Sequence, residues 1–220
     1  MQKVNRGEQM DRAQARGLLY ALLSISLGEP TATLARDWLG GDLVAAFREA
    51  AAALPGLDLE PVLAEMEAGS RPEANVLSEL KLEHLRLFVG PGRVPCPPYE
   101  SVYREDVPAD QRGLLMGPAA ADVRNRYRAA GLDMAAGHVD LPDHMGTELE
   151  FMHFQCQKEL DAWTAGEEAQ AQVWVVGQRS FLADHLKVWT PAFCDALTAA
   201  TENALYRGWA GLCRAYIAAE

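Results

Sequence analysis

The chain has 220 residues, of which 49% are hydrophobic, and its 31 acidic against 20 basic side chains give a formal net charge of −11. This apolar fraction excludes a disordered chain, and the acidic balance argues against a nucleic-acid partner, which requires a basic face to displace counterions. The four cysteines form no CxxC pair, so the sequence predicts reduced, buried thiols rather than a zinc site or a disulfide framework.

Helical periodicity dominates the first half of the chain. Apolar residues recur at helical spacing between helix start and stop signals, which predicts six helices over residues 8–27, 31–39, 42–53, 59–68, 73–88 and 118–130. The longest uncharged stretch, residues 17–28, is too short to span a bilayer, and no signal-peptide cleavage site follows it. We therefore expect a cytoplasmic protein with no integral membrane contact.

Two segments interrupt the helical pattern. Residues 89–108 hold five of the twelve prolines and are predicted to run extended, as an ordered loop or strap. Residues 131–142 contain two glycines and a proline and are the best candidate for a hinge. We therefore predict an N-terminal helical subdomain, residues 1–135, which includes the strap, and a C-terminal helical subdomain, residues 136–220.

The second half is predicted to begin with a long core helix. Six apolar residues from Met145 to Trp163 recur at steps of three and four, and so lie on one helix face. A helix over about residues 167–189 follows, then one with Thr190 as N-cap and Pro191 in its first turn, then a last helix around residues 205–216. The predicted fold is an all-α globular bundle of about ten helices with a proline-rich extended loop.

Few residues suggest catalysis. The motifs for phosphate cradling, dinucleotide binding and zinc-protease chemistry do not occur. Glu150 and His153 form one ExxH pair, but a di-iron bundle needs a second pair, which the sequence lacks. His144 and Glu148 have the spacing to share a metal, although an ordinary polar pair at a helix start explains that spacing better. We expect no cofactor and no metal, with a metal-dependent helical enzyme as an alternative.

The proline-rich segment is more informative. Its residues 95–99 preset a backbone conformation, and Tyr99 and Tyr103 lie four residues apart beside Glu100 and Glu105. A rigid, aromatic and acidic rim of this kind suits peptide docking. A static strap that buries both tyrosines against the bundle accounts for the same composition equally well.

Three runs carry a family resemblance: LFVGPGRVPCPPYESVYRE from Leu87 to Glu105, LPDHMGTELEFM from Leu141 to Met152, and FLADHLKVWTPAF from Phe181 to Phe193. Their order and spacing resemble the TorD/DmsD/NarJ family of cytoplasmic redox-enzyme maturation chaperones. The resemblance implies an all-helical protein without enzymatic activity. It implies that this protein binds the twin-arginine leader and the apo catalytic subunit of a molybdopterin oxidoreductase during cofactor insertion and before export.

The resemblance also implies a peptide-binding surface. This surface combines a helix end, the strap and the start of the hinge helix: His84, Leu87, Phe88, Gly90, Pro91, Gly92, Pro98, Tyr99, Tyr103, Asp143 and His144. A twin-arginine leader presents two guanidinium groups followed by an apolar stretch, so its receptor needs carboxylates beside an apolar groove. We expect Asp143, with Glu100 or Glu148, to accept the arginines.

Two further questions stay open at the level of sequence. A helical assembly scaffold without leader recognition is a second alternative, which a twin-arginine peptide compared with a twin-lysine peptide would distinguish. The oligomeric state is predicted as either a monomer or a dimer formed by exchange of C-terminal helices across the hinge.

Overall fold

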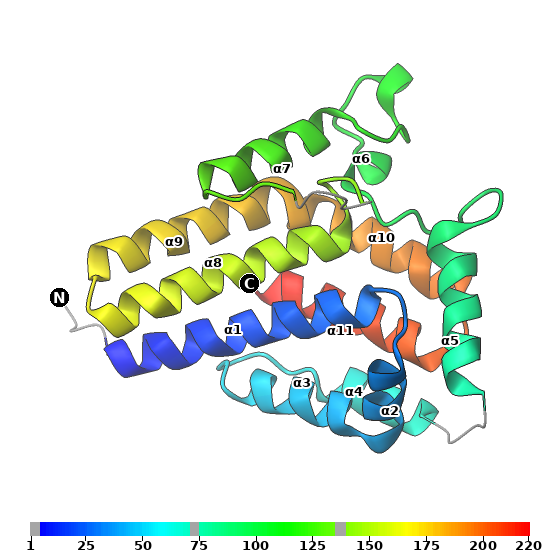
Figure 1. The fold of residues 1–220 in the computed structure, drawn as a ribbon, viewed down its shortest axis with the longest axis horizontal. Coiled ribbons are helices and arrows are strands. Elements are labelled where there is room, and N and C mark those ends of the chain that lie inside the picture. Colours follow the sequence, from blue (N-terminus) through cyan, green and yellow to red (C-terminus); the bar gives the residue numbers. More distant parts are fainter. Residues whose placement is uncertain (1–4, 71–74, 135–139) are drawn as a thin grey trace.

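The fold is helical throughout the part of the chain that the computed structural model describes, residues 5–70, 75–134 and 140–220 (Figure 1). These residues form ten α-helices of nine residues or more, a single-turn α-helix, a short 3-10 helix and two π-helical segments. They contain no strand, and their isolated β-bridge joins Tyr99 to His144. The prediction of an all-α bundle of about ten helices is therefore confirmed.

The six helices predicted in the first half are confirmed, with ends that differ from the prediction by at most three residues. They are α1 (Arg6–Leu27), α2 (Ala32–Gly40), α3 (Asp42–Ala52), α4 (Glu60–Gly69), α5 (Val76–His84), which continues into the π-helical η1 (Leu85–Val89), and α7 (Pro118–Ala129). Among the described residues no single helix is long and apolar enough to cross a membrane. Only α1 and α2 taken together, bent by 117° to each other, reach that length and composition.

One helix boundary in the second half differs from the prediction. Here lie α8 (Met145–Ala165), α9 (Glu168–Phe181), the π-helical η3 (Leu182–Leu186), α10 (Lys187–Ala200) and α11 (Ala204–Ala219). Because η3 continues directly into α10, Thr190 is not an N-cap and Pro191 lies inside the helix. Pro191 has no N–H, so the helix lacks the hydrogen bond from this position to the carbonyl one turn earlier.

The strap also contains a helical turn that the sequence did not predict. Residues 100–103 form the single-turn helix α6 (Glu100–Tyr103), which follows the last closely spaced proline. The Asp143 carboxylate accepts a hydrogen bond from the Ser101 backbone N–H at 2.9 Å, and so satisfies an N–H group at the start of this turn. A side chain 42 residues away therefore stabilises a turn in a segment that was expected to be extended.

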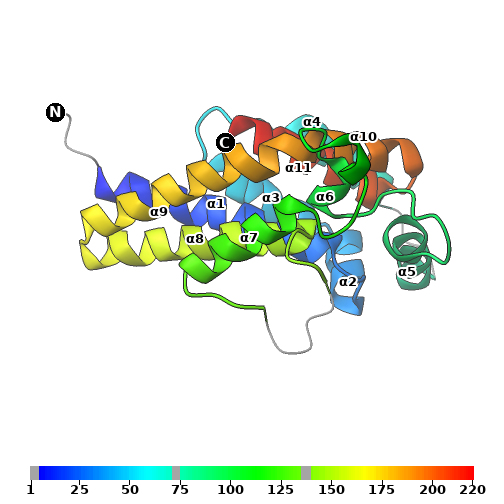
Figure 2. The ribbon, with the colours of Figure 1, turned by 90° about the horizontal axis from the view of Figure 1, so that it is seen from above.

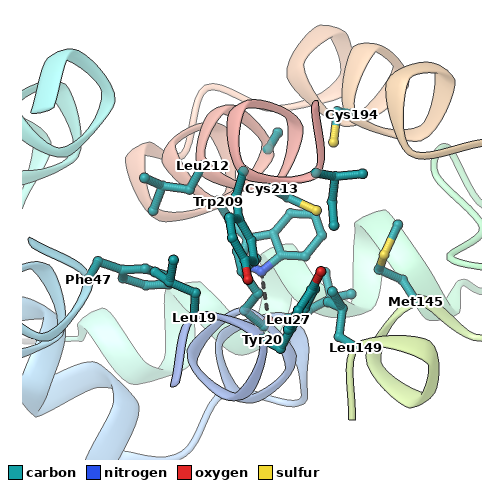
Figure 3. Packing of buried hydrophobic residues seen from close by; sticks show 14 of the residues in the cluster. Leu19, Tyr20, Leu27, Phe47, Met145, Leu149, Cys194, Trp209, Leu212 and Cys213 are labelled. Atoms are coloured by element: carbon teal, nitrogen blue, oxygen red, sulfur yellow. Dashed lines mark hydrogen bonds between the residues drawn. The ribbon is translucent and has the colours of Figure 1, made fainter. Parts of the chain in front are cut away.

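The core is shared between the two halves of the chain. Helix α1 packs along α8, and α4 packs against α11, as two perpendicular views show (Figures 1 and 2). Figure 3 shows Trp209 reaching from α11 toward α1, with Tyr20 and Leu149 beside it. Its indole N–H donates to the Leu23 carbonyl at 2.8 Å. All four cysteines are buried and free.

The predicted division into two subdomains stays a prediction. One hydrophobic cluster runs from α1 to α11 and includes residues on both sides of the predicted boundary. Residues 135–139, which include Gly137 of the predicted hinge and the boundary itself, lie outside the described residues.

The close approach of α4 and α11 yields a stability prediction. A Cβ atom added at Gly208 would lie 2.8 Å from Cγ of Met66, which is buried. We expect Gly208→Val to lower the free energy of unfolding by about 1–3 kcal/mol, because the overpacked core must shift. Gly7→Val is the matched control, since Gly7 lies in α1 with no atom closer than 3.5 Å. Chemical denaturation measures both, and equal losses would contradict the packing argument.

Candidate functional site

A cavity of about 670 Å³ lies where the strap meets the end of α1, the end of α5 and the start of α8. Most of its lining is apolar, including Leu27, Phe88, Val89, Val94, Val102 and Leu115. Its polar lining includes Glu29, His84, Tyr99, Asp140 and His144. The cavity therefore brings together five residues of the predicted peptide-binding surface: His84, Phe88, Pro98, Tyr99 and His144.

The strap is fixed to the start of α8 by backbone hydrogen bonds. The Met145 N–H donates to the Pro98 carbonyl at 2.8 Å, and the Glu100 N–H donates to the Asp143 carbonyl at 2.9 Å. Between these bonds the rings of Tyr99 and His144 meet edge to face, with centroids 5.3 Å apart. His144 is the N-cap of α8, since its Nδ1 accepts from the Gly146 N–H at 3.1 Å. The wall that Tyr99 and His144 form is therefore fixed by backbone hydrogen bonds on both sides of their ring contact.

The opposite wall carries His84 and Phe88. Their rings lie edge to face with centroids 5.2 Å apart, and Nδ1 of His84 is buried without a hydrogen-bond partner. Burial lowers the pKa of His84, while the nearby carboxylates of Glu29 and Asp140 act in the opposite direction. His84 is therefore favoured as the neutral imidazole, which can donate one hydrogen bond and accept another.

Two carboxylates at the mouth of the cavity were not predicted from the sequence. Glu29 follows α1 and pairs with Lys81 of α5 at 3.2 Å, and both side chains are exposed. Asp140 is exposed just before α8 and lies near Tyr99, whose pKa is raised first by burial and then by Asp140. Asp140 directly precedes the LPDH motif, which was a usable signal. Nothing in the sequence near Glu29 indicates more than a turn.

The three carboxylates expected to bind arginines are buried instead. Asp143, Glu100 and Glu148 are each 0% exposed. Oδ2 of Asp143 accepts from the Ser101 hydroxyl at 2.5 Å as well as from its N–H. Glu100 accepts from Arg104 at 2.7 Å and lies 2.8 Å from Nδ1 of His185. In this structure these side chains bond to groups of the chain itself, and their contact with a leader stays a prediction.

Glu148 is the third of these buried carboxylates. Its Oε2 accepts from the indole N–H of Trp189 at 3.0 Å. Burial, followed by the nearby Glu100 carboxylate, raises the pKa of Glu148 well above its usual range. This shift favours the neutral carboxyl, which can donate a hydrogen bond as well as accept one.

These buried contacts join the three sequence motifs. The strap supplies Glu100, the start of α8 supplies Glu148, and the third motif supplies His185 and Trp189. The other ring nitrogen of His185, Nε2, lies 2.9 Å from Oδ2 of Asp122 in α7. His185 and Trp189 are both buried, and each makes a specific polar contact.

The other predicted residues support the cavity or lie outside it. Leu87 is in the core, and Tyr103 packs on Trp189 and Phe193 with ring centroids 5.7 Å away in each case. The turn at 90–92, which includes Pro91, has Gly90 and Gly92 at φ of 101° and 99°, and none of these three residues lines the cavity. Membership of these residues in a peptide-binding surface stays a prediction.

The residues that a metal-dependent enzyme would use as ligands make other contacts in this structure. Glu148 is bonded to Trp189, and Nδ1 of His153 lies 2.9 Å from the Gly17 carbonyl oxygen. Within the described ranges, no group of three or more His, Cys, Asp or Glu side chains is arranged to hold a metal ion.

Comparison with known proteins identifies the family. Residues 42–195 match the family model described as nitrate reductase delta subunit. The perchlorate reductase assembly chaperone protein of Dechloromonas aromatica (strain RCB) is 30% identical over 84% of this chain and 78% of its own length. The chaperone protein TorD of Vibrio cholerae (strain M66-2) is 31% identical over 63% of this chain and 59% of its own. The Tat proofreading chaperone DmsD of Salmonella typhi is 27% identical over 60% and 56%.

The fold, the motifs and these relatives together define an assembly chaperone for redox enzymes rather than a catalyst. The chain belongs to the nitrate reductase delta subunit family, which includes the TorD and DmsD chaperones. The family predicted from the three motifs is thereby confirmed. The matched regions span less than two thirds of the TorD and DmsD relatives.

The buried Glu148 predicts a pH-dependent stability. A carboxyl whose pKa is higher in the folded than in the unfolded protein takes up a proton on folding, so its contribution to stability falls as pH rises above the unfolded pKa of about 4.3. Glu148→Gln keeps the acceptor for Trp189 but needs no proton. We expect it to stabilise the protein by more than about 1 kcal/mol at pH 7 and by nearly nothing at pH 4.

Denaturation curves at several pH values measure this difference. Glu150→Gln is the matched control, because Glu150 is an exposed carboxyl on the same helix, where substitutions typically change stability by less than about 0.5 kcal/mol. A Glu148→Gln variant that is destabilised at pH 7 would show that the ionised carboxylate is the folded form.

Proposed function

We propose that this chain is a cytoplasmic chaperone that binds the twin-arginine leader of a molybdopterin oxidoreductase in the cavity between the strap and α5. It would hold the apo catalytic subunit while the cofactor is inserted and before export. The observation that carries the proposal is an apolar cavity of about 670 Å³ with the two exposed carboxylates of Glu29 and Asp140 at its mouth. The relatives support it, because they are named as a reductase assembly chaperone and a Tat proofreading chaperone.

The two carboxylates are suited to adjacent arginines. Both line the cavity, and both lie within electrostatic reach of His84. A guanidinium group donates parallel hydrogen bonds to a carboxylate, an arrangement that lysine cannot form. The pair between Glu29 and Lys81 is exposed and is worth at most about 1 kcal/mol, so an arginine can displace the lysine at little cost.

The apolar lining must supply much of the affinity. Two charge-assisted hydrogen bonds contribute roughly 1.5–3 kcal/mol each, whereas ordering a flexible leader costs about 2–5 kcal/mol. Micromolar binding needs about 8 kcal/mol. The remainder has to come from apolar burial, at about 25 cal/mol per Å² before the costs of association. Leu27, Val102 and the ring of Tyr99 offer such a surface.

Removing the charge at the cavity mouth should weaken leader binding. We expect Asp140→Asn and Glu29→Gln each to reduce the affinity for a synthetic twin-arginine leader peptide by about five- to tenfold, measured by calorimetry, because each removes a charge-assisted contact. Glu105→Gln is the matched control, since Glu105 is an exposed strap carboxylate that does not line the cavity. Wild-type protein should also prefer the twin-arginine over a twin-lysine peptide. Equal affinity for both peptides would favour the scaffold alternative.

Truncating the aromatic wall should cost more than removing one charge. We expect Tyr99→Ala to weaken binding of the same peptide by more than tenfold, because the half-buried ring contributes apolar contact area. Tyr99→Phe keeps the ring and should bind nearly as well as wild type. Circular dichroism checks that both variants fold. A smaller loss for Tyr99→Ala than for Asp140→Asn would contradict the view that apolar burial dominates.

A further inference from the structure

Exposed apolar side chains gather at one edge of the cavity. Leu114, Leu115 and Met116 are 54%, 53% and 58% exposed, in the connection between η2 (Ala109–Gln111) and α7. Within residues 5–70, 75–134 and 140–220 they form the single run of three consecutive large apolar side chains with such exposure. We call residues 114–116 the lip. Contiguous exposed apolar surface of this kind marks interaction sites in folded proteins.

The lip is continuous with the cavity. Leu115 and the preceding Gly113 both line it, as does Val89 of η1, which is itself 60% exposed. In Figure 1 this connection lies at the upper edge of the bundle, beyond α6. The apolar lining of the cavity therefore extends outward onto a surface that no described part of the chain covers.

The lip is also held in position. The Gly117 N–H donates to the Ser101 hydroxyl oxygen at 3.1 Å, and that hydroxyl is bonded to the buried Asp143. Gly113 and Met116 have φ of 73° and 59°, and Met116 is the one described non-glycine residue with positive φ. A methionine in this conformation is strained, and the surrounding structure maintains it. The lip is therefore part of a turn that hydrogen bonds fix in place, and its apolar side chains are exposed in that fixed conformation.

We infer that the lip binds the apolar stretch of the leader, so that the leader runs from Glu29 and Asp140 through the cavity and out over residues 114–116. This inference rests on the proposed function. Charge places the arginines beside the two exposed carboxylates, which line the cavity together with His84 and Tyr99. The apolar lining continues from there to Leu115. In the leader the apolar stretch follows the arginines, and along the cavity the apolar lining follows the two carboxylates in the same order.

The test is a comparison of two peptides on matched variants. One synthetic peptide carries two adjacent arginines followed by an apolar stretch, and in the other serine and glycine replace that stretch. We expect Leu115→Gln to bind the first peptide about tenfold more weakly than wild type and the second peptide with unchanged affinity. Leu82→Gln is the matched control, because Leu82 is 67% exposed on α5 and does not line the cavity. Melting temperatures check that both variants are folded.

A second measurement fixes the direction of the leader. A photoreactive group in the apolar stretch of the first peptide should label residues 113–116, whereas one next to the arginines should not. Wild-type affinity of Leu115→Gln for the first peptide, or a loss in Leu82→Gln instead, would overturn the inference and leave the proposed function standing. Failure of wild-type protein to bind the first peptide would count against the proposed function itself.

Discussion

A buried polar junction fixes the geometry of the candidate site. Asp143 bonds to Ser101, Glu100 lies between Arg104 and His185, and Glu148 accepts from Trp189. These side chains come from the strap, the start of α8 and the region around η3, and removing one partner from a buried pair of this kind is costly, about 3–5 kcal/mol. The strap is thereby held against α8 at a defined distance from α5. The junction thereby fixes the position of the strap residues that line the cavity.

Local sequence patterns predicted the helices well, but they did not predict the features that depend on contacts between distant residues. The apolar stripe from Met145 to Trp163 was sufficient to place α8, because it depends only on helical spacing. Pro191 was misassigned as a first-turn residue because a π-helical turn allows the chain to continue from α9 into α10. The turn α6 was missed because the side chain that stabilises it, Asp143, is distant in sequence.

The candidate site was likewise predicted only where its residues belong to local sequence motifs. One of its walls was found because Tyr99 and His144 belong to motifs, and the structure brings them into ring contact. Its exposed charges were missed, since a sequence does not show which acidic residues are buried. Three carboxylates within motifs have a structural role, whereas Glu29 and Asp140 reach the cavity mouth through the packing of α1 and α8. Acidic residues in a family motif can thus hold the walls of a cavity in place.

The hydrogen bond between Trp209 and the Leu23 carbonyl joins residues 186 positions apart, and it lies in the middle of the core. Helix α1 packs on α3, which lies close to it in the sequence, and also on α8 and α11, which belong to the second half of the chain. The Ser24 hydroxyl of α1, for example, donates to the Gly146 carbonyl of α8, 122 positions away. Contacts of this range form only after a large loop has closed, which costs conformational entropy. The face of α1 that packs on α8 therefore stays uncovered during folding until the two halves of the chain meet.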